Sequence, residues 1–363
     1  NEELLNDPLY LGYPKPRLRG VDYDRFIEAF VEAVLEVYPH ALLQWEDFKQ
    51  HNAIRLLDRY RHRLASFNDD IQGTAAVVLA GMLAALRLSG EKLSAQRVVL
   101  LGAGAAGTGI ARLLRTAMQA EGQSGEKGCG AIVMLDSQGL LTESRGDLEA
   151  DKRPFALSIQ EMSRFGFDPY KHYDLDAVVR QVAPTVLVGT SAKAGAFTET
   201  TVREMAARTA RPIVLPLSNP TSLSEATPSD VLIWSQGKGL VATGSPFGPV
   251  EVDGRPRAIG QANNVFIFPG LGLGAIVARA REVTDRMFLV AATELSAAVP
   301  DNRLAQGALY PALSDLRRIS KSIAFAVARE ARDEGVGRIA TDGELAADVD
   351  CAIWVPEYDR GSA

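Results

Sequence analysis

The sequence predicts an α/β fold in which a doubly wound sheet is flanked by helices and followed by a helical C-terminal segment. Short runs of Val, Ile and Leu occur at 97–101, 131–135, 185–188 and 213–215. The first run leads directly into a glycine-rich turn and a helix, and the later runs end in polar residues. This order is typical of a sheet that binds its ligands at the carboxyl ends of the strands.

The glycine-rich turn, residues 102–107, has the pattern GxGxxG between a strand and a helix that extends through Met118. Gly102 permits a tight turn, Gly104 lets a pyrophosphate approach the backbone, and Gly107 lets the helix pack closely on the strand. The free N–H groups at the start of the helix favour phosphate. The turn therefore predicts a Rossmann-type dinucleotide site, whose expected contacts are Gly102, Gly104, Ala105, Ala106 and Gly107.

Asp136, at the end of the run 131–135, is the acid expected to bind the ribose diol of the dinucleotide. The interval after the glycines is long because the loop 121–130 is inserted. A carboxylate accepts from a 2′-hydroxyl and repels a 2′-phosphate, so Asp136, with Ser137 beside it, favours NAD. Lys152 and Arg153 downstream are either a basic surface loop or cations that neutralise a phosphate, so NADP use stays open.

Two adjacent carboxylates, Asp69 and Asp70, stand between a strand predicted at 64–67 and a long helix that ends near Leu88. We expect Asp70 to cap this helix, because its oxygen can accept from the free N–H groups of the first turn. The helix is rich in small residues, which allow close approach of another backbone or of a ligand.

A second acidic pair, Glu46 and Asp47, follows a strand predicted at 42–45. Adjacent strand residues point to opposite faces, so both acids can reach one ion only if the strand breaks at Glu46. The four histidines form no HxxxH or HxH pair, and the four acids therefore suggest a hard divalent cation held by oxygen. The alternative is a capped helix with a solvated acidic loop.

Further polar residues follow the later strands. Gly189 and Asn219 stand at the ends of the runs 185–188 and 213–215, where a ligand of such a sheet lies. Asn219 is alternatively a turn residue before a proline. Asn263 belongs to a pair of amides that either contact a ligand or satisfy the backbone of their own loop.

The remaining predicted elements are helices. The recurrence of apolar residues and the Pro and Thr signals predict them at 23–38, 51–61, 271–280, 285–298 and 316–334, with Thr227 and Pro228 beginning another. The tail from Gly335 has weak periodicity.

Composition excludes several classes of protein. The 363 residues suffice for about two domains. A net charge of -6 without basic runs argues against a nucleic-acid partner. The two cysteines, Cys129 and Cys351, form neither a disulfide framework nor a zinc motif, so a cytoplasmic location is expected. We find no uncharged stretch long enough for a bilayer and no signal peptide, and we expect no membrane partner.

Together these segments resemble the malic enzymes, most closely the bacterial NAD-linked branch, over nearly the whole chain. The matching segments, in chain order, are Trp45-Glu46-Asp47-Phe48, 67–74, the turn at Gly102, Leu217-Ser218-Asn219-Pro220-Thr221, Gly244-Ser245-Pro246-Phe247 and 263–270. The resemblance implies divalent-metal-dependent oxidative decarboxylation of L-malate to pyruvate and CO₂ with reduction of NAD. It also implies a homo-oligomer, a dimer or tetramer.

The resemblance also assigns roles to residues. Glu46, Asp47 and Asp70 match the family's three ligands to Mn²⁺ or Mg²⁺, and Asp69 matches the acid beside its catalytic lysine. Asn219 and Asn263 match amides at the malate and the nicotinamide. The family's catalytic lysine and tyrosine have no counterpart here, and the context of Lys49, Tyr60 and Lys193 does not support them in those roles.

The expected chain is therefore the C-terminal metal- and NAD-binding part of a malic enzyme, without the N-terminal domain; its first residue, Asn1 rather than Met, agrees. Residues 1–68 would be the remainder of the substrate and metal domain, 69–334 the NAD-binding domain with following helices, and 335–363 a peripheral tail. Two alternatives stay open. One is a catalytically silent dinucleotide-binding module, and the other is a malolactic enzyme, which returns the hydride to give lactate.

Overall fold

The computed structural model describes residues 2–122, 132–252 and 254–356. The chain divides into two compact units, Asn1–Ala41 and Leu42–Ala363. In the first unit, α1 (Glu2–Asn6) precedes the long amphipathic helix α2 (Gly20–Val37), which is the helix predicted at 23–38. The candidate site lies wholly in the second unit. The domain boundaries expected at 68/69 and 334/335 stay a prediction.

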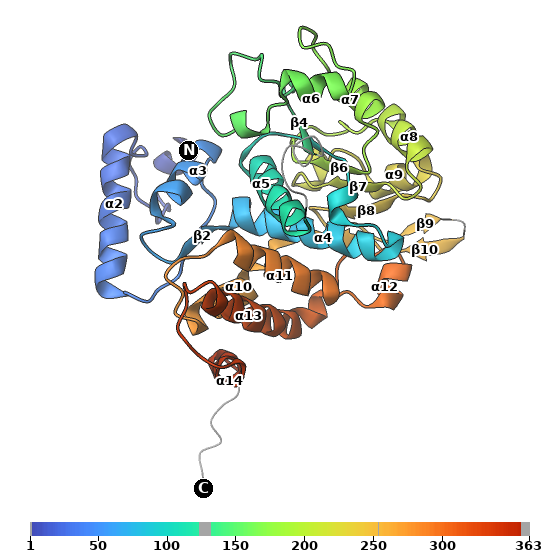
Figure 1. Cartoon of the computed structure of the whole chain (residues 1–363). Helices are drawn as coiled ribbons and strands as arrows, with labels where there is room; N and C mark the ends of the chain where they lie inside the picture. Colours follow the sequence, from blue (N-terminus) through green and yellow to red (C-terminus); the bar gives the residue numbers. More distant parts are fainter. Residues whose placement is uncertain (1, 123–131, 253, 357–363) are drawn as a thin grey trace. The chain divides into compact units, whose positions relative to one another are not determined.

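The second unit contains a sheet whose seven described strands run in the order β11-β8-β7-β6-β3-β4-β5 (Figure 1). All neighbours are parallel except β4 and β5. The strands are β3 (Val98–Leu101), β4 (Ile132–Asp136), β5 (Gly139–Leu140), β6 (Val186–Gly189), β7 (Ile213–Pro216), β8 (Leu240–Thr243) and β11 (Gly260–Gln261). The chain leaves β3 toward β4 and returns to its other side at β6, so the doubly wound fold is confirmed.

Helices cover both faces of this sheet because its strands are apolar on both sides. Val98 and Leu100 belong to one buried cluster and Val99 to another, as alternation along a strand requires. The first cluster includes residues of α4 (Thr74–Ser89), α5 (Ala105–Ala120), α10 (Phe268–Val277), α11 (Asp285–Ala297) and α13 (Leu316–Asp333). The second includes residues of α6 (Ile159–Arg164), α7 (Leu175–Val182), α8 (Glu199–Arg208) and α9 (Pro228–Trp234).

Helix α4 shows why its sequence is rich in small residues. A Cβ atom at Gly81 would lie 2.2 Å from the hydroxyl oxygen of Tyr310, which donates to the backbone oxygen of Val77 at 2.8 Å. The small side chains of this helix therefore serve tight packing. By length and composition alone the segment Asp69–Ser89 could cross a membrane, but it carries charged residues and 78% of its most apolar window is buried inside the protein.

Several elements were not predicted. Helix α14 (Asp342–Ala352) buries Leu345 and Val349, and its capping box between Thr341 and Glu344 is a signal that the sequence contained. Helix α12 (Asp301–Ala305) and the hairpin of β9 (Val250–Val252) and β10 (Arg255–Arg257) were not predicted either. In contrast, β1 (Leu43–Trp45), α3 (Gln50–Tyr60) and β2 (Ser66–Asn68) are the elements predicted at 42–45, 51–61 and 64–67. Cys351 is exposed and free, whereas Cys129 and most of the predicted inserted loop lie outside the described residues.

Candidate active site

The two acidic pairs meet at one edge of a small sheet. Strands β1 and β2 are parallel, and Trp45 pairs with Asn68 at their carboxyl ends. The next residues along each strand are the acidic pairs, so the four carboxylates leave the sheet at the same edge. Strand β1 ends at Trp45, and Asp47 has a left-handed backbone with φ of 54°. The predicted break at Glu46 is thus confirmed.

The expected cap at Asp70 is wrong. The helix begins with a wider π-helical turn, η1 (Asp69–Gly73), and the side chain of Asn68 caps it by accepting from the N–H of Ile71 at 2.9 Å. The wider turn begins at Asp69, so its cap is Asn68 and not Asp70. The carboxylate of Asp70 is therefore not used for capping. Its Oδ2 accepts from the N–H of Asp47 at 3.2 Å instead, which ties the two acidic pairs together.

Asn264 links this turn to the loop before α10. Its Nδ2 donates to Asp69 Oδ2 at 3.0 Å and to Thr74 Oγ1 at 3.1 Å. Asp69 is 6% exposed, and its other oxygen has no hydrogen-bond partner among the described residues. A Cβ atom at Gly73 would lie 2.3 Å from that oxygen, so only glycine leaves space for it.

The acidic pairs 46–47 and 69–70, together called the acidic loop below, carry like charges that repel one another. Burial raises the pKa of Glu46, and the three neighbouring aspartate charges raise it further. Burial likewise raises the pKa of Asp69, although Asn264 donates to this carboxylate, and the charge of Asp70 adds to the shift. Burial and the charge of Asp47 also raise the pKa of Asp70. A cation among these groups would relieve both the repulsion and the cost of burial.

The donor chemistry therefore fits a divalent cation that prefers oxygen ligands, as does the unpaired buried oxygen of Asp69. Among the described residues, however, no group of three or more Asp, Glu, His or Cys side chains is already arranged to hold a metal ion. The carboxylates lie in two segments, the loop after β1 and the turn η1, at one edge of the small sheet. The assignment of Glu46, Asp47 and Asp70 as metal ligands stays a prediction.

The glycine turn follows β3, the strand from which the sheet is extended first on one side, by β4, and then on the other side, by β6. Gly102 has φ of 115°, and a Cβ atom there would lie 2.5 Å from the backbone oxygen of Thr190, at the end of β6. A Cβ atom at Gly107 would lie 1.9 Å from the backbone oxygen of Gly102, which confirms its role in helix–strand packing. Helix α5 begins at Ala105, followed by Ala106, and its cap residue Gly104 has no side chain to occupy the free N–H groups.

Asp136 is the last residue of β4, as expected, but its carboxylate is not free. Arg145 donates to both of its oxygens, at 2.9 and 3.0 Å, and the ammonium of Lys152 lies 3.6 Å away. Burial acts to raise the pKa of Asp136, but the bonds from Arg145 and the Gln138 N–H hold it below its ordinary value. Sequence reasoning missed Arg145, which follows no periodic signal, and Ser137 beside Asp136 is exposed.

A buried carboxylate, also missed, joins the ends of β6 and β7. Glu225 is fully buried, and its Oε1 accepts from the N–H and Oγ of Ser191 at 2.7 and 2.8 Å. The same oxygen accepts from Ser218 Oγ at 2.6 Å. A Cβ atom at Gly189 would meet the Glu225 side chain at 2.5 Å, so Gly189 makes room for this carboxylate.

The two predicted asparagines are bonded within their own loops. Asn219 Oδ1 accepts from Ser245 Oγ at 2.6 Å, which links the loops after β7 and β8. Asn263 Oδ1 accepts from the N–H of Val265 at 3.0 Å and caps the short helix η6 (Asn264–Phe266). In the described structure Asn263 thus satisfies its own loop, whereas its neighbour Asn264 contacts the acidic turn. Tyr60 is fully buried and stacks on Trp45.

The acidic turn and the dinucleotide turn are brought together by α5. A Cβ atom at Gly109, on this helix, would lie 2.7 Å from the backbone oxygen of Ile71 in η1. The helix that begins at the glycine turn therefore packs directly on the turn that carries Asp69 and Asp70.

Comparison with known proteins agrees with this arrangement. Residues 71–332 match the family model described as malic enzyme, NAD binding domain, and residues 1–61 match malic enzyme, N-terminal domain. The chain belongs to the malic enzyme family. The expectation that the N-terminal domain is lacking is wrong, because residues 1–61 match that domain.

Curated relatives and a solved structure point the same way. The chain is 45% identical over 358 residues to an NAD-dependent malic enzyme of Photorhabdus laumondii and 44% identical to one of Pseudomonas aeruginosa, covering 99% of this chain in both cases. It spans 63% and 64% of the length of these relatives. The crystal structure of Entamoeba histolytica malic enzyme is 28% identical with a TM-score of 0.70, over 91% of this chain and 63% of that one.

Proposed function

We propose that this malic enzyme chain acts in the NAD-linked oxidative decarboxylation of L-malate, giving pyruvate, CO₂ and NADH. The observation that carries the proposal is the contact between α5 and η1 at Gly109 and Ile71, since it joins a dinucleotide turn to a cluster of four carboxylates. A reaction that oxidises a hydroxy acid and then removes CO₂ needs a hydride acceptor and a positive charge close together. The names of the curated relatives agree with this reaction.

In this proposal Glu46, Asp47 and Asp70 hold a divalent cation, Mn²⁺ or Mg²⁺. The bound cation would polarise the substrate oxygen at C2 during hydride transfer and decarboxylation. Asp69 would lie beside the reacting atoms, and Asn264 would fix its orientation through the 3.0 Å hydrogen bond to Oδ2.

The coenzyme would lie across the carboxyl ends of β3, β4 and β6. Its pyrophosphate would face the N-terminus of α5 at residues 102–107, and Gly189 and Asn219 would line the nicotinamide side. Asp136, oriented by Arg145, would accept from the ribose hydroxyls of NAD. NADP is the second candidate, because Arg145 and Lys152 reduce the repulsion that a free carboxylate would exert on a 2′-phosphate.

Three further parts of the proposal rest on the resemblance. Asn219 and Asn263 would contact malate, and the Nδ2 group of Asn263 can donate to a malate carboxylate while its Oδ1 keeps the bond from Val265. The active form would be a homodimer or homotetramer in the cytoplasm. The lysine and tyrosine that transfer protons in the family have no assigned counterpart, so we expect this 363-residue chain alone to bind the coenzyme without turnover.

Incubation with L-malate, Mn²⁺ and NAD, with NADH, pyruvate and lactate all quantified, tests the proposal. Equal amounts of pyruvate and NADH would support it and would overturn the expectation of no turnover by the chain alone. Lactate without net NADH would show a malolactic enzyme. Folded protein that binds NADH and Mn²⁺ but forms no product is the expected result. Failure to bind NADH would contradict the proposal.

A catalytically silent module is distinguished by its metal affinity. Such a module needs the dinucleotide turn but gains nothing from four carboxylates at one edge of a sheet. Mn²⁺ binding that depends on the acidic loop would therefore favour the enzyme over the module.

A further inference from the structure

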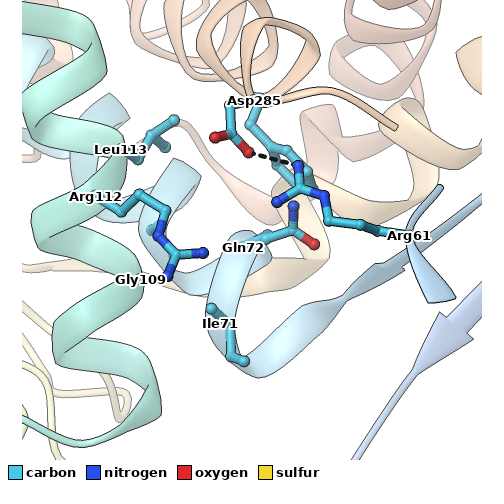
Figure 2. A pocket seen from close by; sticks show the side chains of 9 residues that line it. Arg61, Ile71, Gln72, Gly109, Arg112, Leu113 and Asp285 are labelled. Carbon is cyan, nitrogen blue, oxygen red and sulfur yellow. Dashed lines mark hydrogen bonds and ion pairs between the residues drawn. The ribbon is translucent and has the colours of Figure 1, made fainter. Parts of the chain in front are cut away.

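A small pocket lies behind the acidic turn, between η1, α5 and the start of α11 (Figure 2). Its polar lining comes from Arg61, Gln72, Arg112 and Asp285, and its apolar lining includes Ile71, Leu113 and Phe288. None of these residues has a role in the proposed reaction. The empty volume is about 310 Å³, of which about 20 Å³ can be occupied by the centre of a water-sized particle. One water molecule or one monatomic ion therefore fits without movement of the walls.

Gln72 gives the pocket an unsatisfied donor. This residue is only 7% exposed, and its Oε1 accepts from the N–H of Asn68 at 3.0 Å, which fixes the orientation of the amide. The Nε2 atom is buried and has no hydrogen-bond partner among the described residues. A buried amide nitrogen without an acceptor is unfavourable, so an acceptor in the pocket would stabilise this arrangement.

The charges of the lining also favour an acceptor. Arg61 forms an ion pair with Asp285 at 3.0 Å, with only 16% of the arginine side chain exposed. Arg112 is an exposed residue of the lining, and no ion pair joins it to a carboxylate among the described residues. Among the lining side chains, two arginines and one aspartate leave one positive charge in excess. Figure 2 shows the side chains of Arg61, Gln72 and Arg112 around the same space.

An anion suits this lining better than a water molecule does, because an anion needs no acceptor. Among the lining carboxylates water could donate only to Asp285, whose Oδ1 already accepts from Arg61. A monatomic anion accepts from all donors at once and neutralises the excess charge. We propose that this pocket binds a monovalent anion of the size of chloride, held by Gln72 Nε2 and the guanidinium of Arg112, with Arg61 completing its surroundings.

The site would also support the acidic turn. Gln72 belongs to the same π-helical turn as Asp69 and Asp70, and its side chain is fixed from one side by Asn68. An anion on the other side would hold the amide from both directions. Chloride should then stabilise the folded chain beyond the general effect of salt, because a ligand that binds only the folded state raises its stability.

The ³⁵Cl NMR linewidth of sodium chloride, measured with the full chain in gluconate buffer, tests the proposal without any use of turnover. We expect the wild-type chain to broaden the chloride signal and bromide to compete for the same site. Arg112→Met removes the free cation, and Gln72→Glu keeps the acceptor toward Asn68 while replacing the buried donor. Each variant should weaken chloride binding by about tenfold or more, as expected for a lost hydrogen bond to a charged group.

Arg203→Met is the matched control, because this half-exposed arginine lies on α8 and pairs with Glu199. It should leave the broadening unchanged. The urea midpoint provides a second measurement: sodium chloride should raise it above the value in sodium gluconate for the wild type and not for Arg112→Met. Wild-type broadening retained by either pocket variant would overturn the proposal, as would its absence from the wild type, which would leave water as the occupant.

Discussion

Arg145 donates to both carboxylate oxygens of Asp136, at 2.9 and 3.0 Å, so the acid expected to bind the coenzyme ribose is already held by a cation. Arg145 also pairs with Asp147 at 2.9 Å on the surface. The geometry fixes the orientation of the Asp136 carboxylate at the end of β4. The arrangement leads to two predictions, one on coenzyme choice and one on pH.

Asp136→Ala should weaken NADH binding by about tenfold, because a hydrogen bond from the ribose to a charged group is lost. NADPH binding should be unchanged or stronger, since Arg145 and Lys152 lose a competing carboxylate. Fluorescence titration with both reduced coenzymes measures the two affinities. Asp147→Asn is the control, because it removes the other carboxylate of Arg145 without touching the ribose site. Equal weakening for NADH and NADPH would contradict the assignment.

The ion pair also predicts a dependence of stability on pH. The pKa of Asp136 is lowered below its ordinary value of 3.8 in the folded chain, so the ionised form is favoured by folding. This stabilisation is fully present above the ordinary value and is lost as the pH falls through the lower, folded value. The urea midpoint of wild type minus that of Asp136→Asn should be constant from pH 7 to pH 5 and should shrink below pH 4. A difference that persists unchanged to pH 3 would refute the prediction.

Glu225 predicts a loss of stability at the ends of β6 and β7. Its buried carboxylate accepts from Ser191 and Ser218 Oγ at Oε1 and from the Ser218 N–H at Oε2, so the NH₂ group of Glu225→Gln would face one of these donors. We expect the free energy of unfolding to fall by about 2–3 kcal/mol, as for a lost charge-assisted hydrogen bond. Urea unfolding measures it. The exposed Glu251 on β9 provides the control, and Glu251→Gln should stay within about 0.5 kcal/mol; equal effects of both variants would argue against this role.

Gly107→Ala should separate α5 from β3. The added Cβ atom would lie 1.9 Å from the backbone oxygen of Gly102, and overpacking of this kind costs about 1–3 kcal/mol. NADH binding should weaken as well, because the N-terminus of α5 moves. Gly146→Ala is a matched control, since no heavy atom lies within 4 Å of its Cβ position. The prediction fails if Gly107→Ala binds NADH as the wild type does and unfolds at the same urea concentration.

The sequence alone predicted the features that depend on local pattern. The turn at Gly102, the helix from Ala105 and the break of β1 at Glu46 follow from glycine geometry, helix capping and strand alternation. Asn68 was missed as the cap because the first turn is π-helical, and the spacing rules for capping assume an ordinary α-helical turn.

The features that were missed depend on contacts between distant segments. Asn264 and Asp69 are 195 positions apart in the sequence, and no local pattern at either residue predicts their hydrogen bond. Arg145 and Glu225 were missed for the same reason, because an ion pair or a buried carboxylate is defined by tertiary packing. The excess of carboxylates at 46–47 and 69–70 was visible in the sequence, but their common location became clear only from the parallel pairing of β1 with β2.

Mn²⁺ binding to the chain tests the central claim most directly. Asp70→Asn keeps an oxygen that can accept from the N–H of Asp47 but removes one of the proposed ligand charges. The electron paramagnetic resonance signal of free Mn²⁺ should show binding by the wild type, weakened by about tenfold or more in Asp70→Asn. Asp22→Asn, on α2 with 75% of its side chain exposed, should bind as the wild type does. Equal Mn²⁺ affinities for the wild type and Asp70→Asn would contradict the assignment of the acidic loop as the metal site.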